Sequence, residues 1–471
     1  MLKKTKIVAT IGPSTEKEEV MTELVKAGMN VMRLNFSHGD FEEHGNRVVV
    51  ARKVSKKTGI PIAIMQDLGG PKIRIGNFST ESITLKPGAA FTLTTEEIVG
   101  DEKRVYVNYP LLPKEVKKGG FILIHDGKKK LEILDIVGNE IKCKVIVGGD
   151  IKGKRGVNLP GAYLSISSIT EKDRKDLEFG IKHKVDFIAL SFVRRPQDIL
   201  ELRDILDKVK CKAGIIAKVE TPEAVENIDE IIRLCDGIMV ARGDLAIEVP
   251  AEDVPLIQKM IIRKCNEAGK PVITATQMLE SMIKSPVPTR AEVSDIANAI
   301  LDGTDAIMLS EETALGEYPL QAIEVMSRVS KRVESDYLHK QLLGNPNPQG
   351  LTGVGDSINA SAVRNADRIG AVSLVSLTQT GYSARMMSRH RPEHPILVFT
   401  PNPVAYQRII LSFGCYPVMI QKFTDFDEVL KVIRTHCLKQ KIAKKGDRIV
   451  IASGMPFGKV IETNMLVVDT I

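Results

Sequence analysis

The chain has 471 residues, which at roughly 150 residues per domain indicates about three domains. Hydrophobic residues make up 43% and charged residues 27%, a balance typical of folded globular proteins and not of disordered chains. The net charge of +7, with only 4% aromatic residues and no tryptophan, leaves nucleic-acid binding as a weak secondary reading that rests on charge alone.

The location of the protein is indicated by what the sequence lacks. No stretch approaches the ~18 uninterrupted apolar residues that a membrane span needs. The start, MLKKTKIVATIGPS, lacks the apolar core and cleavage site of a secretory signal. The six scattered cysteines form no CxxC pair, which favours reduced thiols over disulfides or a zinc site. We therefore expect a cytoplasmic protein without a membrane partner.

Eight short apolar runs rich in β-forming residues recur along the chain, and most are followed by an amphipathic segment. They are Lys6–Gly12, Asn30–Asn35, Pro61–Asp67, Phe187–Phe192, Gly214–Glu220, Gly237–Asp244, Pro271–Gln277 and Ala306–Glu311. Strands that alternate with helices form parallel sheets. Eight such units predict a closed (β/α)8 barrel, although an open doubly wound sheet has the same local pattern.

The long interval between Asp67 and Phe187 has a different character. Short strands separated by Gly, Pro and Asp are expected at Ile73–Gly76, Ser82–Leu85, Ala90–Thr94, Val105–Val107, Phe121–Ile124, Lys130–Val137 and Glu140–Val147. This pattern predicts a small β-barrel domain inserted after the third barrel strand. Hinges are expected at Gly69–Pro71 and at Ile169-Thr170, so the inserted domain could act as a lid that excludes water.

After the eighth strand we expect a helix from Pro319 to about Tyr337, followed by a polar linker at Gly344–Gly355. Strands then resume at Ala371–Leu377, Ile396–Phe399, Tyr416–Ile420, Arg448–Ile451 and Leu466–Val468. These elements predict a C-terminal open α/β domain. The expected division is therefore a barrel at 1–69 and 170–343, a lid at 70–169 and a C-terminal domain at 344–471.

Polar side chains gather where the predicted barrel strands end, which is where active sites form in this fold. They are Arg33, Asn35, Ser37, Asp67, Lys218, Glu220, Arg242, Asp244, Thr274, Thr276 and Ser310. Any single one could be a strand or helix cap, but the whole set favours a site.

Two of these groups, Glu220 and Asp244, end adjacent strands and could share one Mg²⁺ ion. Lys218 lies on the same strand face as Glu220, and Arg33 offers a bidentate donor for phosphate. Together they indicate a phosphorylated or enolate-forming substrate with magnesium. The alternative is a buried salt-bridge network of Lys218 with both acids.

Nine segments, in order and spacing, resemble the pyruvate kinase family. They are TKIVATIGPST, GMNVMRLNFSHGD, DLGGPKIR, KGKRGVNLPG, DFIALSFVR, IIAKVET, IMVARGDLAIEVP, ITATQMLESMI and PTRAEVSDIANAILDGTDAIMLSEETALGEYP. The resemblance implies the same three-part fold, a homotetramer, and transfer of a phosphoryl group from phosphoenolpyruvate to ADP, giving pyruvate and ATP.

The resemblance also implies roles for single residues. Glu220 and Asp244 would hold Mg²⁺, or Mn²⁺ in its place, and Lys218 would stabilise the phosphoryl group and the enolate. The substrate carboxylate would be held by the amides of Gly243 and Asp244 with Thr276, and the phosphate by Arg33. Thr276 or Ser310 would belong to the route that protonates the enolate.

The nucleotide and an effector would bind elsewhere in the family pattern. Arg74, Arg155 and the turn formed by Asn35, Phe36, Ser37 and His38 would face the nucleotide. The loop with Thr378, Thr380 and Ser383 corresponds to one that binds a phosphorylated effector, and ordinary helix capping is the alternative.

Three departures from the family pattern affect these roles. Lys72 stands where the family usually has a glutamate beside a potassium site built from groups matching Asn35, Ser37, Asp67 and the carbonyl of Leu68. We expect the lysine ammonium to replace potassium, so that the ion is not required; alternatively, Lys72 is a mobile lid residue facing solvent. Arg155 stands where the family has a lysine, so the positive charge is kept. Glu311 stands beside Ser310 where the family has a glycine, which puts the local proton relay in doubt.

Two other function classes remain open from the sequence. Another barrel enzyme that handles phosphoenolpyruvate or pyruvate, such as an aldolase or mutase, would share the metal and enolate chemistry but would need no nucleotide lid. A catalytically silent regulatory protein would not need Lys218, Glu220, Asp244 and Thr276 together.

Overall fold

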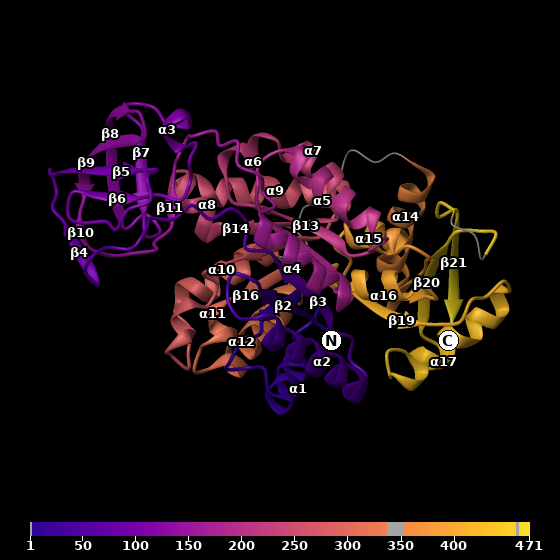
Figure 1. Ribbon diagram of the computed structural model, residues 1–471. Helices are drawn as coiled ribbons and strands as arrows, with labels where there is room; N and C mark the ends of the chain where they lie inside the picture. The colour runs from indigo at the N-terminus through magenta and orange to yellow at the C-terminus, as the bar shows by residue number, and fades with distance from the viewer. Residues whose placement is uncertain (1, 337–352, 458–460) are drawn as a thin grey trace.

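The computed structural model describes residues 2–336, 353–457 and 461–471. Three parts lie in a row, with the inserted domain at the upper left, the barrel in the middle and the yellow C-terminal domain at the right (Figure 1). The predicted helix end at Tyr337, the boundary after residue 343 and most of the predicted linker lie outside the described residues. The exact domain division stays a proposal.

The middle part is a closed barrel of parallel strands in the order β1-β16-β15-β14-β13-β12-β3-β2. The strands are β1 (Lys6–Thr10), β2 (Val31–Asn35), β3 (Ala63–Asp67), β12 (Phe187–Val193), β13 (Gly214–Val219), β14 (Gly237–Ala241), β15 (Val272–Ala275) and β16 (Ala306–Leu309). Each lies within or close to a predicted run. The closed pairing confirms the barrel and excludes the open doubly wound sheet.

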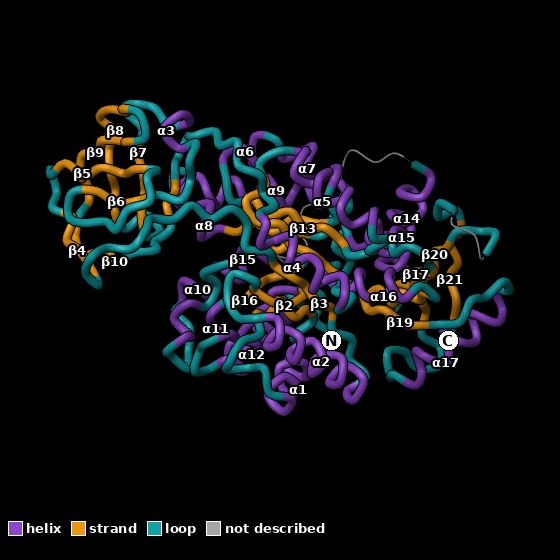
Figure 2. Tube along the Cα trace, in the orientation of Figure 1, coloured by secondary structure: helices purple, strands orange, loops and turns teal. Residues whose placement is uncertain are grey.

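Helices surround the barrel strands (Figure 2). They are α1 (Glu18–Ala27), α2 (Phe41–Thr58), α4 (Glu171–Lys182), α5 (Pro196–Lys208), α6 (Pro222–Glu226), α7 (Ile228–Leu234), α8 (Arg242–Glu248), α9 (Val254–Ala268), α10 (Arg290–Leu301), α11 (Glu311–Ala314) and α12 (Pro319–Glu334). Two 3-10 turns, η1 (Ala251–Asp253) and η2 (Glu280–Ile283), complete this layer.

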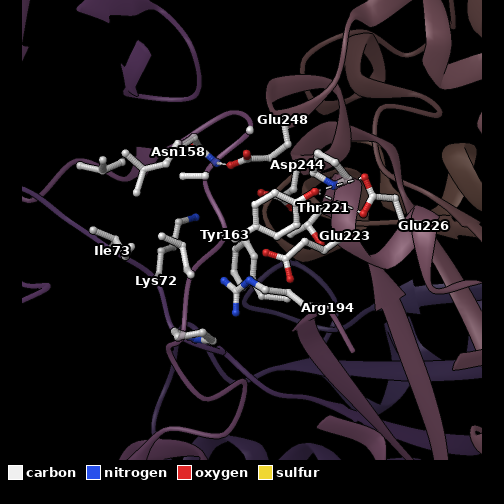
Figure 3. A pocket seen from close by; sticks show the side chains of 18 of the residues that line it. Lys72, Ile73, Asn158, Tyr163, Arg194, Thr221, Glu223, Glu226, Asp244 and Glu248 are labelled. Atoms are coloured by element: carbon white, nitrogen blue, oxygen red, sulfur yellow. Dashed lines mark hydrogen bonds between the residues drawn. The ribbon is translucent and has the colours of Figure 1, made fainter. Parts of the chain in front are cut away.

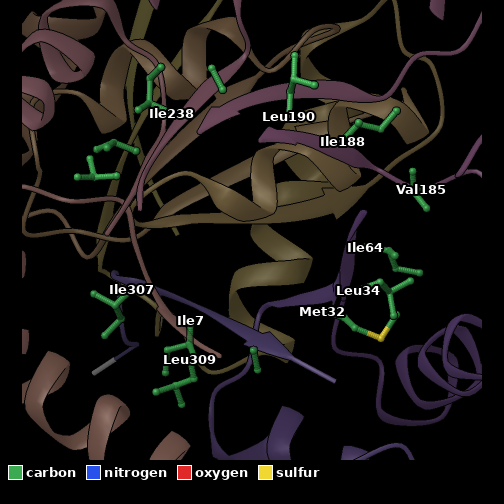
Figure 4. Packing of buried hydrophobic residues seen from close by; sticks show 14 of the residues in the cluster. Ile7, Met32, Leu34, Ile64, Val185, Ile188, Leu190, Ile238, Ile307 and Leu309 are labelled. Atoms are coloured by element: carbon green, nitrogen blue, oxygen red, sulfur yellow. The ribbon is translucent and has the colours of Figure 1, made fainter. Parts of the chain in front are cut away.

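The barrel core has two shells because strand side chains alternate between two faces. In β1, Ile7 and Ala9 join the large cluster between strands and helices, and Val8 joins the cluster inside the barrel. Figure 4 shows part of the outer cluster, including Ile7, Leu34 and Leu190. The positions of the strand ends, and of the polar groups they carry, are fixed by this packing.

The inserted domain holds a six-stranded sheet in the order β11-β7-β8-β9-β5-β6 and a two-stranded sheet, β10-β4. The strands are β4 (Ser82–Leu85), β5 (Ala90–Thr94), β6 (Arg104–Tyr106), β7 (Phe121–Ile124), β8 (Lys129–Val137), β9 (Glu140–Val147), β10 (Gly149–Lys152) and β11 (Val157–Asn158), with one short helix, α3 (Leu112–Glu115).

The predicted strand at Ile73–Gly76 takes the form of isolated bridges, and these connect the two edges of the six-stranded sheet. Arg74 pairs with Gly156, next to β11, and Ile75 pairs with Val107, next to β6. This segment therefore closes the sheet around one apolar core, as expected of a small barrel.

The C-terminal domain is an open sheet in the order β19-β18-β17-β20-β21, with only β21 antiparallel to its neighbour. Its elements are α14 (Val354–Ile369), β17 (Ser373–Leu377), α15 (Tyr382–Ser388), β18 (Ile396–Thr400), α16 (Pro403–Arg408), η3 (Ile409–Leu411), β19 (Cys415–Met419), α17 (Phe426–Lys439), β20 (Arg448–Ser453) and β21 (Met465–Thr470). Ile410 and Leu411 pack into the inner barrel cluster and so join the two domains. Within the described residues, no helix is long and apolar enough to cross a membrane.

Candidate active site

A buried charge cluster lies at the carboxyl ends of β2, β3 and β13. The Nζ atom of Lys218 lies 3.0 Å from Oε1 of Glu220 and 3.2 Å from Oδ1 of Asp67. The other oxygen of Asp67 lies 2.6 Å from Nε of Arg33, and Nη1 of Arg33 donates to Thr10 at 2.8 Å. Lys218 therefore pairs with Glu220 and Asp67. The alternative of a salt-bridge network of Lys218 with both Glu220 and Asp244 is met only for Glu220.

Two members of the cluster, Lys218 and Asp67, are held in their ionised forms. Burial alone would lower the pKa of Lys218, but the carboxylates of Asp67 and Glu220 raise it above its ordinary value. Burial alone would raise the pKa of Asp67, but Lys218 and Arg33 hold it below its usual range. At neutral pH the site therefore contains a buried ammonium at Lys218, next to the guanidinium of Arg33.

Glu220 and Asp244 fit a site for a divalent cation. Burial raises the pKa of Glu220, and the nearby charge of Asp244 raises it further, although Lys218 opposes both. The described residues offer the Asp244 carboxylate no hydrogen bond or ion pair. No group of three or more His, Cys, Asp or Glu among them could hold a metal. A pair of carboxylates, with water and substrate oxygens as the other ligands, is the arrangement that Mg²⁺ accepts.

Thr276 is held in a strained turn after β15. Its φ is +70°, which is unusual for a β-branched residue. The amide of Gly243 donates to its Oγ1 at 2.7 Å, and Nη2 of Arg242 donates to its carbonyl at 2.8 Å. Arg242 is itself fixed by Asp295, 2.7 Å away. By contrast, Thr274, two residues earlier in β15, is fully buried, so its side chain is not available to a ligand.

Ser310 follows β16, and its backbone is held by a buried acid. Its amide donates to Oε2 of Glu312 at 2.7 Å, and Oε1 of the same residue accepts from the amide of Leu279 at 3.2 Å. Burial raises the pKa of Glu312. Glu311, which departs from the family pattern, is exposed on α11.

The turn after β2 divides into a buried and an exposed part. The ring of Phe36 is buried and stacks on His44, with centroids 4.3 Å apart. Ser37 and His38 are exposed, and the Ser37 amide donates to Oδ1 of Asn35 at 3.2 Å. The exposed Ser37 and His38 are therefore the part of this turn that is open to a ligand. The backbone of Phe36 is already paired, because its amide donates to the carbonyl of Asp67 at 2.9 Å and its carbonyl accepts from Nζ of Lys172 at 2.7 Å.

A cavity lies between the inserted domain and the barrel (Figure 3). Lys72, Asn158 and Tyr163 line it from the inserted domain, and Asp244 and several other acidic residues line it from the barrel. Nδ2 of Asn158 donates to Glu248 at 2.8 Å, which joins the two domains across the cavity.

The predicted nucleotide-facing cations lie on the inserted domain. Nη1 of Arg74 donates to the carbonyl of Lys154 at 3.0 Å. The buried Nε of Arg155 finds no hydrogen-bond partner among the described residues. Lys72 is exposed toward the cavity, where its Cε lies 3.3 Å from the position that a Cβ on Gly156 would take. Its ammonium makes no hydrogen bond or ion pair with the described residues.

A second, smaller pocket lies in the C-terminal domain and contains Thr378, Thr380 and Ser383. The hydroxyl oxygens of Thr378 and Thr380 accept from the amides of Gly381 and Tyr382, at 3.0 and 3.3 Å. Ser383 shares a hydrogen bond with Thr463, so all three hydroxyls have local partners. No basic side chain among the described residues lines this pocket.

The sequence comparisons agree with this geometry. A model described as pyruvate kinase, barrel domain, matches residues 2–323, and one described as pyruvate kinase, alpha/beta domain, matches residues 356–468. The chain belongs to the pyruvate kinase family. It is therefore a glycolytic phosphotransferase.

Individual relatives support the assignment over the full length. A pyruvate kinase of Geobacillus stearothermophilus is 45% identical over 474 residues, covering 100% of this chain and 81% of that protein. One of Clostridium perfringens is 44% identical over 477 residues, covering 100% of both. The crystal structure of a pyruvate kinase from Cryptosporidium parvum matches with a TM-score of 0.94 at 37% identity, covering 99% of this chain and 96% of that one.

Two further polar residues belong to this pyruvate kinase site and are not among the candidates predicted from the sequence. Thr10 ends β1 and accepts from Arg33, and Ser191 near the end of β12 accepts from Lys218 at 2.7 Å. Each hydroxyl stands at or near the end of an apolar run, Lys6–Gly12 or Phe187–Phe192, and that position is the signal in the sequence that marks both residues.

Proposed function

We propose that this pyruvate kinase transfers the phosphoryl group of phosphoenolpyruvate to ADP through an enolate stabilised by Mg²⁺, with Lys218 as its central catalytic residue. The observation that carries the proposal is the buried ammonium of Lys218, 3.0 Å from Glu220 and 3.2 Å from Asp67. A positive charge fixed before the substrate arrives stabilises negative charge that develops during phosphoryl transfer.

The other residues of the cluster bind and orient the substrate. Nη2 of Arg33 has no partner among the described residues and is available for a phosphate oxygen. The amides of Gly243 and Asp244, with the hydroxyl of Thr276, would hold the substrate carboxylate. The Gly243 amide and the Thr276 hydroxyl would then exchange their present hydrogen bonds, to Thr276 and to the carbonyl of Ala275, for bonds to the substrate. Thr276 or Ser310 would lie on the route by which the enolate carbon receives its proton. The lid would keep water from the phosphoryl group.

Glu220 and Asp244 would hold Mg²⁺, or Mn²⁺ in its place. When bound, the cation would neutralise charge on the enolate and phosphoryl oxygens. We test this with Glu220→Gln and Asp244→Asn, measuring pyruvate formation against Mg²⁺ concentration and Mn²⁺ binding by electron paramagnetic resonance. Each variant should weaken Mn²⁺ binding and lower activity. Unchanged binding in both variants would contradict the assignment.

ADP would bind between lid and barrel at Arg74, Arg155 and the turn from Asn35 to His38, none of which lines the cavity of Figure 3. The proposal is supported by the unpartnered Nε of Arg155 and by the exposed Ser37 and His38. Arg155→Met should raise the KM for ADP more than the KM for phosphoenolpyruvate. An equal rise in both would count against a nucleotide role.

We further propose that the enzyme does not require potassium. Groups matching the usual potassium site are present in Asn35, Ser37, Asp67 and the Leu68 carbonyl, but that carbonyl accepts from Ser191 at 2.7 Å. Asp67 is already paired with two cations. With Lys72 supplying a further positive charge, turnover should be equal with and without potassium, and Lys72→Glu should become dependent on it. Turnover of the unaltered enzyme only with potassium would overturn the proposal.

For the C-terminal pocket we propose a phosphorylated effector bound at Thr378, Thr380 and Ser383. A Thr380→Ala, Ser383→Ala double variant should lose activation by a sugar phosphate while keeping its basal rate. Retained activation would leave helix capping as the role of these hydroxyls. A homotetramer is proposed as well, to be checked by light scattering.

A further inference from the structure

The strand β12 contains an irregularity beside the candidate site. Leu190 pairs with Ala217 and Val193 pairs with Val219, so the register between β12 and β13 shifts by one residue. Phe192, within this shift, has a φ of +51°. We call the pair Ser191 and Phe192 the β12 bulge. Bulges at the rim of a barrel commonly redirect a side chain.

The first residue of the β12 bulge holds the catalytic lysine. Ser191 is 2% exposed, and its Oγ lies 2.7 Å from Nζ of Lys218 and 2.7 Å from the carbonyl oxygen of Leu68. The lysine can only donate and the carbonyl can only accept. The serine hydroxyl therefore donates to Leu68 and turns a lone pair toward Lys218.

The second residue of the β12 bulge holds the acid proposed to bind the cation. The amide of Phe192 donates to Oε2 of Glu220 at 2.7 Å, while Oε1 of Glu220 faces Lys218. Phe192 has a positive φ in the conformation in which its amide points toward Glu220. Two adjacent residues of one strand thus set the positions of both Lys218 and Glu220.

Both connections between the barrel and the lid also touch the β12 bulge. At the first, a Cβ on Gly70 would lie 2.9 Å from Cβ of Ser191 and 3.0 Å from Cδ2 of Phe192, so only glycine fits there without displacement. At the second, the buried Ser168 donates its hydroxyl to the carbonyl of Phe192 at 2.9 Å. The hinges of the lid therefore rest directly on the residues that hold the catalytic groups.

We propose that the β12 bulge is a positioning element that couples the lid hinges to Lys218 and Glu220, with Ser191 as the positioning residue for the lysine and Ser168 as the contact from the hinge. The inference rests on the proposed roles of Lys218 and Glu220. It predicts that a substitution at the hinge lowers kcat by displacing the β12 bulge, and does not act only by raising the KM for the substrate.

The test is a double-mutant cycle on the full-length enzyme, with kcat and KM for phosphoenolpyruvate as readouts. Ser191→Ala should lower kcat roughly 10- to 100-fold, because a hydrogen bond to a charged group is lost, and should change KM by less than about 3-fold. Ser168→Ala should lower kcat by roughly 3- to 10-fold, as expected for a lost neutral hydrogen bond. The combined variant should lose little more than Ser191→Ala alone, because coupled residues are not additive.

Matched controls separate coupling from general damage. Ser167→Ala removes the neighbouring hinge hydroxyl, whose partners are the backbone groups of Ile169 and the carboxylate of Glu201 on α5, and should leave kcat unchanged. Melting temperatures are measured for every variant. Should Ser191→Ala be unfolded, Ser191→Cys, a somewhat larger side chain with a weaker hydrogen-bonding group, takes its place in the cycle.

Losses that multiply in the combined variant, or a Ser168→Ala enzyme that behaves like Ser167→Ala, would overturn the inference. Lys218→Met is assayed alongside. If that variant stays active, the proposed role of Lys218 fails; if it is inactive and the cycle is additive, only the coupling fails.

Discussion

Nε of Arg33 lies 2.6 Å from Oδ2 of Asp67, and both side chains are almost completely buried. The second oxygen of Asp67 lies 3.2 Å from Nζ of Lys218. One carboxylate therefore orients the two cations that we assign to the substrate phosphoryl group. Because the cluster is preorganised, little reorientation is needed when charge develops in the reaction.

Asp67→Asn tests whether this carboxylate is needed for both stability and activity. Two buried cations would lose their shared counter-charge, so the free energy of unfolding in urea should fall by roughly 3–5 kcal/mol, and kcat should fall with it. Asp204→Asn, at the exposed pair with Lys208, is the control and should change stability by less than about 1 kcal/mol. Equal behaviour of the two variants would contradict the assigned role of Asp67.

The pH dependence of stability should carry a signature of Lys6, which lies between barrel and C-terminal domain. Burial lowers the pKa of Lys6 from 10.5 to about 8. Between these values the unfolded chain binds the proton and the folded chain does not, so folding is favoured more as pH rises. The gain across this window is at most about 3 kcal/mol.

Lys6→Met provides the measurement. The free energy of unfolding of this variant, followed by urea denaturation from pH 7.5 to 10.5, should rise less over this window than that of the unaltered enzyme. The neighbouring Lys3, whose pKa burial lowers to about 7, contributes a rise in both proteins. In the unaltered enzyme, Nζ of Lys6 donates to the carbonyl of Cys415 at 2.6 Å. Removing this hydrogen bond should also lower the free energy of unfolding at every pH. Parallel curves for the two proteins would show that Lys6 does not titrate in this way.

Asn158→Ala should weaken closure of the lid. Its side chain donates to Glu248 at 2.8 Å across the cavity between lid and barrel. Loss of this bond should raise the KM for ADP or lower kcat by roughly 3- to 10-fold, the effect of one hydrogen bond. Asn139→Ala, at an exposed turn of the same domain, is the matched control. An Asn158→Ala enzyme with unchanged kinetics would mean that this contact does not contribute to closure.

Much of the fold could be predicted because the barrel strands are short apolar runs with regular spacing. How the sheet of the inserted domain closes could not be predicted from the sequence. Ile73–Gly76 has strand-like residues but forms only isolated bridges to the two edges of that sheet. Which polar strand ends face the site also depends on side-chain direction. Thr274 is fully buried within the barrel strand β15, whereas Thr276, two residues later, follows that strand with a positive φ.

The role of Ser191 illustrates the limit most clearly. In the sequence it is one hydroxyl within the apolar run DFIALSFVR, and nothing local marks the register shift that turns it toward Lys218. The bulge follows from the pairing of β12 with β13, which is a tertiary property. Conversely, Lys218, Glu220 and Asp67 could be placed together because parallel strands bring their carboxyl ends to one rim.

The most direct measurement is pyruvate formation from phosphoenolpyruvate and ADP with Mg²⁺, comparing the unaltered enzyme with Lys218→Met. Lys208→Met, at an exposed lysine on α5, serves as the control. We predict that Lys218→Met loses about 10³-fold or more in kcat, as expected when a charge on the transferring phosphoryl group is removed, while the control keeps full activity. A Lys218→Met enzyme that retains its kcat within about tenfold, a loss below ~1.4 kcal/mol, would contradict the central claim.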